Sequence, residues 1–168
     1  ICVVGAGYWG KNHIRTLNEL GLLGGVIETN SEIRSNIANQ YPTVSIYKNL
    51  DDALQNDDLD GFTVATPVNT HYEIAKNIIQ SYKHVMVEKP LVSNIEHAIE
   101  LVDLSRIYSV NIMVGHVLLF HPAIQKIKKL IEGGMIGKLQ YIYSNRLNLG
   151  QVRTEENVFW SLAPHDIA

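Results

Sequence analysis

The stretch VVGAGYWGKN, residues 3–12, places three glycines, Gly5, Gly7 and Gly10, directly after a short apolar run. This G-x-G-x-x-G spacing is typical of the strand-to-helix turn that binds the pyrophosphate of a dinucleotide. Gly5 is expected to allow the tight turn, Gly7 the close approach of the pyrophosphate, and Gly10 the packing of helix on strand. The helix start adds backbone N–H groups and a partial positive charge, both suited to an anion. The same glycines also fit a turn that binds nothing, so the surrounding sequence has to decide.

An acidic residue, Glu28, supports the nucleotide interpretation. It ends the second apolar run, GGVIE, and lies 18 residues after Gly10, close to the spacing of about 20 expected for an acid that binds ribose hydroxyls. Its charge would repel a 2′-phosphate, and no arginine stands at Thr29 or Asn30 to offset it. The sequence therefore predicts NAD as the cofactor in preference to NADP. The residues predicted to contact it here are Gly5, Gly7, Tyr8, Trp9, Gly10 and Glu28, with the two aromatic side chains expected to pack rather than to react.

Short apolar runs alternate with helical patterns along the first two thirds of the chain. Such runs, each followed by a crossover helix, predict a parallel sheet covered on both faces. We therefore expect a doubly wound (Rossmann) α/β domain over 1–117 and the truncated start of an α+β substrate domain over 118–168. Thr70, with Glu73 three residues later, resembles a capping box and predicts a helix start. The expected strands are ICVV (1–4), GGVIE (24–28), VSIY (44–47), GFTVAT (61–66), HVMVE (84–88), NIMVG (111–115) and KLQYIYSNRLNL (138–149). The expected helices cover 9–20, 31–40, 70–81, 94–107 and 122–132, with a short helical turn at DDALQN (51–56).

Composition narrows the class of protein. In 168 residues, 14 Lys and Arg stand against 17 Asp and Glu, giving a net charge of −3, so we expect no basic face for nucleic acid. No apolar run reaches the ~20 residues that span a bilayer, and the single cysteine, Cys2, cannot form an internal disulfide. A cytoplasmic protein without membrane contact is expected. The chain starts inside an expected strand and ends inside an expected helix, so we interpret it as a piece of a longer protein, poorly soluble and inactive by itself because the strand over 139–148 has no partner.

Side chains that follow the expected strands are candidates for chemistry, because ligands of doubly wound sheets gather at the carboxyl ends of the strands. Lys89, in VEKP, could hold a substrate oxygen by a charge-assisted hydrogen bond. A solvated lysine at a strand tip is the alternative. His71 is expected in a first helical turn near the nucleotide, and His13 on the surface. His165 begins a helix after a loop and is either a base or a helix-start residue.

Four segments, VVGAGYWG, ATPVNTH, VEKP and SLAPHDI, together resemble the Gfo/Idh/MocA family of nicotinamide-dependent sugar oxidoreductases along the whole chain. The resemblance implies a Rossmann domain, a C-terminal α/β domain that covers the substrate, and a homo-oligomer. It makes Lys89 the catalytic lysine and His165 the catalytic histidine, and it implies a cis peptide bond before Pro90. Ser161 and Ala168 depart from it, since many members have acidic residues at those places. It also implies cofactor contacts by Thr66, Pro67, Asn69, His71, Glu88 and Lys89.

The predicted function is NAD-dependent oxidation of a secondary sugar hydroxyl, or the reverse reaction, with no metal. His165 would take the hydroxyl proton while Lys89 steadies the negative oxygen. The tail is similar to members that oxidise C3 of a UDP-N-acetylhexosamine. The predicted substrate contacts are Lys89, Arg146, Asn148, Arg153 and His165, although the three tail residues also fit a solvated surface. The alternatives are a free-sugar or inositol dehydrogenase of the same family, a nicotinamide-binding regulator without turnover, and a methyltransferase using S-adenosylmethionine, which VEKP fits poorly.

Overall fold

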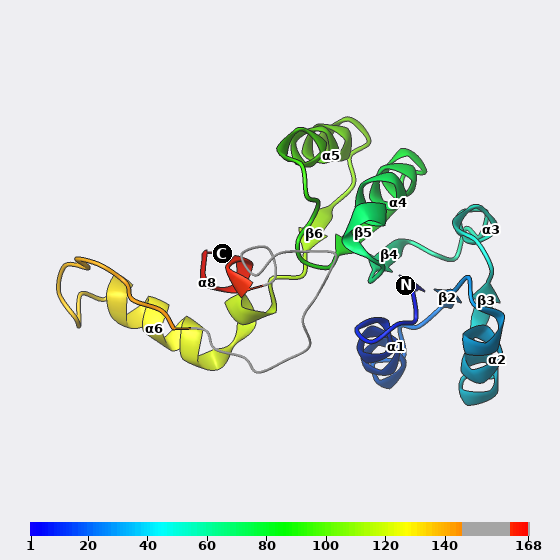
Figure 1. Cartoon of the computed structure of the whole chain (residues 1–168), viewed down its shortest axis with the longest axis horizontal. Coiled ribbons are helices and arrows are strands. Elements are labelled where there is room, and N and C mark those ends of the chain that lie inside the picture. Colours follow the sequence, from blue (N-terminus) through cyan, green and yellow to red (C-terminus); the bar gives the residue numbers. More distant parts are fainter. Residues whose placement is uncertain (146–161, 168) are drawn as a thin grey trace. The chain divides into compact units, whose positions relative to one another are not determined.

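The computed structural model describes residues 1–145 and 162–167. The chain divides into two compact units, 1–115 and 116–168. In the first unit six strands form one sheet in the order β3-β2-β1-β4-β5-β6, and every pair is parallel (Figure 1). This order is that of a dinucleotide-binding Rossmann domain, so the predicted fold class is confirmed. The strands are β1 (Cys2–Val4), β2 (Gly25–Ile27), β3 (Ser45–Tyr47), β4 (Gly61–Val64), β5 (His84–Val87) and β6 (Ile112–Val114).

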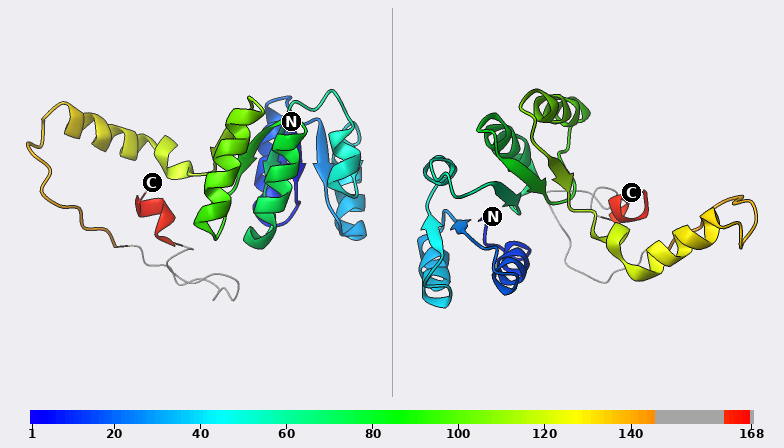
Figure 2. Two further views of the ribbon diagram at one scale, coloured as in Figure 1. Left: turned by 90° about the horizontal axis from the view of Figure 1, so that it is seen from above. Right: turned by 180° about the vertical axis from the view of Figure 1, so that it is seen from behind.

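Helices cover both faces of this sheet (Figures 1 and 2). On one face Ile14 and Ile37 pack against Val3 and Val26, and all four side chains are buried. On the other face the largest buried side chain is Phe62, which belongs to a cluster built from the remaining three helices and the strands. The first face carries α1 (Gly10–Glu19) and α2 (Ser31–Gln40), and the second carries α3 (Leu50–Leu54), α4 (Val68–Gln80) and α5 (Ile95–Ile107).

The central strand β1 is apolar along its whole length because both of its faces are buried. In β1, Cys2 and Val4 belong to one core cluster and Val3 to the other, as the two-residue period of a strand requires. Burial raises the pKa of the Cys2 thiol to about 12, so this cysteine is a core side chain rather than a nucleophile.

The predicted helix start at Thr70 is wrong by two residues. The helix begins at Val68 after Pro67, and no reciprocal box with Glu73 forms. Instead Thr70 Oγ1 lies 2.7 Å from both Thr66 Oγ1 and Pro67 O. The hydroxyl therefore stabilises the loop that leads from β4 into the helix. A threonine side chain forms such local hydrogen bonds to a loop as readily as it caps a helix.

The second unit contains a 3-10 turn, η1 (Val117–Phe120), and two helices, α6 (Pro122–Glu132) and α8 (Pro164–Ile167), within its described residues. The expected strand over 138–149 is wrong where the structure describes it, since residues 138–145 adopt no regular structure. A strand needs a neighbour for its backbone groups, and no strand partner lies in the described part of this unit. In residues 1–145 and 162–167 no helix has the length and apolarity to cross a membrane.

Candidate cofactor and catalytic site

The glycine loop after β1 has the geometry that its three glycines predict. Gly5 adopts φ of +89°, and a Cβ there would lie 2.9 Å from Thr66 Cγ2. A Cβ at Gly10 would lie 1.9 Å from the carbonyl oxygen of Gly5, so only glycine lets α1 start this close to the loop. At Gly7 a Cβ would meet nothing within 4 Å. The loop is thus tight at its two ends and open in the middle, where a pyrophosphate is expected.

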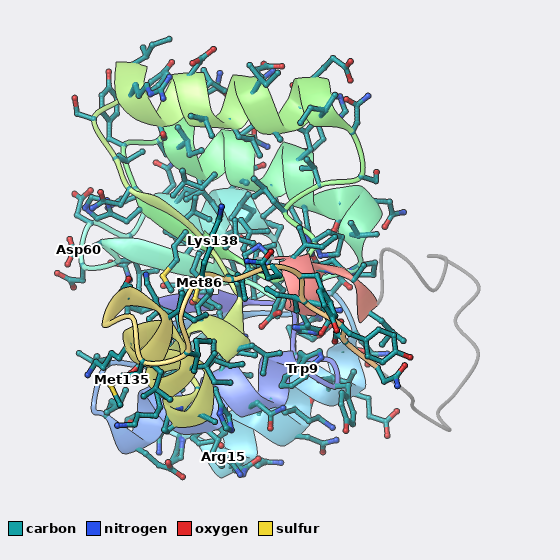
Figure 3. The ribbon with its side chains drawn as sticks, turned by 90° about the vertical axis from the view of Figure 1, so that its left-hand side faces the viewer. Trp9, Arg15, Asp60, Met86, Met135 and Lys138 are labelled. Atoms are coloured by element: carbon teal, nitrogen blue, oxygen red, sulfur yellow. The ribbon has the colours of Figure 1, made fainter. Side chains whose placement is uncertain are left out.

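The start of α1 lacks a side-chain cap, unlike the start of α2. Trp9 occupies the N-cap position and makes no capping hydrogen bond, whereas the Asn30 side chain caps α2 through two backbone N–H groups. Tyr8 is 87% exposed and Trp9 46% exposed, and their rings meet edge to face at 6.0 Å. Trp9 stands at the first turn of α1 (Figure 3). The two residues were expected to pack, but neither ring is buried in the core; the rings contact each other, and their predicted contact with the cofactor stays a prediction.

Glu28, at the end of β2, is held by backbone N–H groups. Its Oε2 accepts from Ala6 N and its Oε1 from Asn30 N, both at 2.9 Å. Thr29 Oγ1 adds a longer contact to Oε1 at 3.4 Å, and Oε2 keeps a further lone pair, which suits a ribose hydroxyl. Arg34, which the sequence analysis passed over, donates from Nη1 to the carbonyl oxygens of Glu28 at 2.8 Å and Thr29 at 2.6 Å. Arg34 lies six residues after Glu28 and in the first turn of the predicted helix over 31–40. That position could have indicated that Arg34 lies near Glu28.

His71 connects the loop after β4 to the turn after β5. The ring is 2% exposed, with Nδ1 3.0 Å from Pro90 O and Nε2 2.8 Å from Thr66 O. An enclosed ring can influence a cofactor through the two backbone segments that it contacts. The peptide bond between Lys89 and Pro90 is cis, as predicted. The predicted contacts of Thr66, Pro67, Asn69 and His71 with the nicotinamide side stay predictions.

At the end of β5 the structure corrects the interpretation of His13. This histidine was expected on the surface, but its Nε2 lies 2.7 Å from Glu88 Oε1, and the side chains of the pair are only 19% and 12% exposed. Lys89 N donates to Glu88 Oε2 at 3.2 Å. Burial alone would raise the pKa of the Glu88 carboxyl, but the hydrogen bond and charge of His13 and the Lys89 N–H outweigh it and lower that pKa. Lys89 is the second residue after β5.

Four of the predicted substrate residues do not belong to the described part of the first unit. His165 lies in α8 of the second unit, so its predicted pairing with Lys89 stays a prediction. Arg146, Asn148 and Arg153, and the two departures from the family pattern, Ser161 and Ala168, fall outside the described residues. Within the described residues no group of three His, Cys, Asp or Glu side chains could hold a metal ion.

A parallel sheet in this order, with a tight glycine loop and a carboxylate at one edge, defines a dinucleotide-binding Rossmann domain. A family model described as an oxidoreductase family with an NAD-binding Rossmann fold, GFO_IDH_MocA, matches residues 1–116. The chain therefore belongs to the Gfo/Idh/MocA family of oxidoreductases, and the cofactor predicted from Glu28, NAD, agrees with the family's description.

Known relatives add activities of their own. UDP-N-acetylglucosamine 3-dehydrogenase of Acidithiobacillus ferrooxidans is 28% identical over 98% of this chain and 51% of its own length. Inositol 2-dehydrogenase of Corynebacterium glutamicum is 27% identical over 82% of this chain and 42% of its own. The crystal structure of the WlbA dehydrogenase of Bordetella pertussis, in complex with NADH and UDP-GlcNAcA, superimposes with a TM-score of 0.75 at 27% identity, covering 81% of this chain and 42% of that one. The chain thus spans about half the length of these relatives.

Proposed function

We propose that this chain supplies the cofactor domain, 1–117, and the start of the substrate domain, 118–168, of an NAD-dependent dehydrogenase that oxidises a secondary hydroxyl of a sugar. The observation that carries the proposal is the shared sheet edge within the first unit. The glycine loop follows β1, Glu28 ends β2 and Lys89 follows β5, and in a parallel sheet these carboxyl ends lie on one edge. A dinucleotide laid across that edge would run from Glu28 over Gly7 toward Lys89.

Each residue has a distinct task in this proposal. The N–H groups of the glycine loop bind the pyrophosphate and Glu28 accepts from the adenosine ribose hydroxyls. NAD, when bound, accepts a hydride from the alcohol carbon. The Lys89 ammonium donates a hydrogen bond to the alcohol oxygen as negative charge grows on it, and His165 takes the hydroxyl proton. General base assistance of this kind contributes roughly 10²–10⁴ in rate.

The substrate we propose is a nucleotide-linked amino sugar, oxidised at C3. A relative with UDP-N-acetylglucosamine 3-dehydrogenase activity aligns over nearly the whole chain, and the WlbA structure contains a UDP-sugar. Arg146, Asn148 and Arg153 would then contact the diphosphate or the uronate-type groups of such a substrate. The whole protein would act in the cytoplasm as a homo-oligomer. A free-sugar or inositol dehydrogenase is the second candidate, because inositol 2-dehydrogenase aligns over most of the chain.

A substrate panel tests this proposal on the full-length protein. UDP-N-acetylglucosamine, UDP-glucose, free N-acetylglucosamine and myo-inositol are each incubated with NAD, and the absorbance of reduced nicotinamide is followed. We expect turnover with the UDP-amino sugar. Turnover of myo-inositol alone would move the assignment to the second candidate, and tight NAD binding without any turnover would favour a nicotinamide-binding regulator.

Two lysines at opposite ends of β5 provide a matched control. Lys89 follows the strand and Lys83 precedes it. We expect Lys89→Ala to lower kcat by about 10²-fold or more, while the Kd for NAD changes little. Lys83→Ala, the same substitution at the amino end, should leave kcat near the wild-type value. Equal kcat values for the two variants would contradict the proposed role of Lys89.

A further inference from the structure

The Glu88 carboxylate is enclosed by three parts of the first unit. From α1, His13 Nε2 lies 2.7 Å from Oε1. From its own strand end, Lys89 N donates to Oε2 at 3.2 Å. From the end of β6, Gly115 lies so close that a Cβ there would be 3.2 Å from Oε2 and 3.3 Å from the carboxyl carbon. Glu88 is 9% exposed, so this is a built arrangement and not a surface pair.

We propose that His13 is a positioning residue for the reaction, which fixes Glu88 and, through Glu88, the backbone from which the Lys89 side chain departs. The inference rests on the proposed function, since it assigns His13 a role only if Lys89 serves the chemistry. His13 lies three residues after Gly10, in the turn of α1 that follows the glycine loop. The pair therefore connects the helix expected to bind the pyrophosphate with the strand end expected to bind the reacting oxygen.

The groups around Glu88 favour its ionised carboxylate over the protonated form. The titratable or charged groups that face the Glu88 carboxylate in the described part of the chain are His13 from α1 and Lys89 from its own strand end; the neighbour on β6, Gly115, carries no charge. Burying a carboxylate without a partner is costly, whereas a charge-assisted hydrogen bond offsets that cost. Loss of the imidazole would remove the 2.7 Å contact that holds Oε1 and leave the Lys89 N–H and the charge of Lys89, so Glu88 would be less firmly held and easier to protonate.

The arrangement has a consequence for the geometry of the site. If Glu88 turns, the Glu88–Lys89 peptide loses the acceptor for its N–H, and the amine at the end of the lysine side chain moves with its backbone. Displacements of about 1 Å in groups that contact reacting atoms can cost roughly 10²-fold in rate. The pyrophosphate site, made by the loop before His13, depends on this pair much less. The expected signature is a loss in kcat with little change in cofactor affinity.

An NMR titration tests the contact itself without any turnover. The amide proton of Lys89 donates to Glu88 Oε2, so its chemical shift followed against pH reports the protonation of that carboxylate. We expect the midpoint to move up by about one pH unit in His13→Leu, and by less in His13→Gln, which keeps an N–H donor without a charge. His97→Asn is the control, because the His97 ring of α5 stacks on the Tyr72 ring of α4, with centroids 3.8 Å apart, and not on Glu88. The midpoint of the Lys89 amide titration in this variant should equal that of the wild type.

Steady-state kinetics on the full-length protein then test the role. We expect His13→Leu to lower kcat about tenfold or more, with the KM for NAD changed less than about threefold, and His13→Gln to recover most of the loss. Gly115→Ala, which pushes on Glu88 Oε2 from the other side, should lower kcat in the same way even if His13→Leu folds poorly.

The outcomes separate this inference from the proposed function. The positioning role would be overturned if His13→Leu kept both the wild-type midpoint of the Lys89 amide and the wild-type kcat. It would also be overturned if His13→Gln were as impaired as His13→Leu. If instead Lys89→Ala retains full activity, the proposed function itself is wrong, even though the NMR titration can still show that His13 holds Glu88.

Discussion

Two glutamates at the same edge of the sheet are held in different ways. Glu28, after β2, receives two backbone N–H groups, from Ala6 and Asn30, while the nearby guanidinium of Arg34 binds carbonyl oxygens instead of the carboxylate. Glu88, after β5, faces the imidazole of His13. The donors on Glu28 are uncharged, since Thr29 Oγ1 adds a longer contact at 3.4 Å to the two N–H groups, whereas the Glu88 carboxylate faces a titratable imidazole.

The difference separates a binding end from a reaction end. Under the proposed function, Glu28 accepts hydrogen bonds from ribose hydroxyls, so substitutions there should change cofactor affinity. Under the proposed role of His13, the Glu88 carboxylate fixes the backbone at Lys89, so substitutions there should change kcat. Both ends depend on the segment around α1, since Ala6 N precedes the helix and His13 lies within it. The three predictions below test this comparison.

The largest expected effect comes from Gly10→Ala, which would disturb both ends together. The added Cβ would lie 1.9 Å from Gly5 O, so α1 would have to shift relative to the loop. We expect the free energy of unfolding in urea to fall by about 3 kcal/mol or more.

Gly7→Ala is the matched control for that variant. A Cβ at Gly7 meets nothing within 4 Å, so the free energy of unfolding should stay within about 0.5 kcal/mol of the wild type. Its added methyl group would occupy space expected for the pyrophosphate, and the Kd for NAD should rise. Equal losses of stability in the two variants would contradict the assigned packing role of Gly10.

A smaller effect is expected from comparing Glu28→Gln with Glu88→Gln. Hydrogen bonds to a charged group contribute about 1.5–3 kcal/mol, so losing the charge at Glu28 should raise the Kd for NAD about tenfold, measured by calorimetry. The Kd for NADP should rise less or fall, because the repulsion of a 2′-phosphate is removed. Glu88→Gln should lower kcat more than it raises the Kd for NAD. The comparison fails if both variants change the Kd for NAD equally.

The smallest effect is the pH dependence of stability at Glu88. Its folded-state pKa lies below the ordinary value of 4.5, so the ionised carboxylate stabilises the folded chain fully above about pH 4.5. That contribution is lost as pH falls through the folded-state pKa. The difference in unfolding free energy between the wild type and Glu88→Gln should therefore be constant near neutral pH and shrink in acid. If the difference in unfolding free energy between the two proteins instead grew as pH falls, the lowered pKa assigned to Glu88 would be contradicted.

Local patterns predicted the first unit well because each element there is a regular apolar run between clear signals. The helix over 31–40 has its predicted bounds, as does the helix over 122–132 in the second unit, and the glycine loop has its predicted geometry. The positions of Glu28 and Lys89 just beyond β2 and β5 were predicted because the apolar runs mark where those strands end, and the roles of both residues stay predictions. Features predicted from residue spacing alone were predicted less accurately. The capping box expected from Thr70 and Glu73 does not form, and the helix begins at Val68.

The contacts that sequence reasoning missed join segments far apart in the chain. His13 and Glu88 are 75 residues apart, and His71 and Pro90 are 19 apart. The order of the strands brings α1 beside the end of β5. The hydrophobic periodicity of the sequence does not predict that order. The strand expected at 138–149 failed over 138–145 for a related reason: an apolar segment forms a strand when a neighbour accepts its backbone hydrogen bonds.

The most direct test is a crystal structure of the full-length protein with NADH. We expect the pyrophosphate on the N–H groups of the loop around Gly7, the adenosine ribose hydroxyls on Glu28, and the nicotinamide ring beside the Lys89 amine. A pyrophosphate bound away from the glycine loop, or a nicotinamide ring remote from Lys89, would contradict the account.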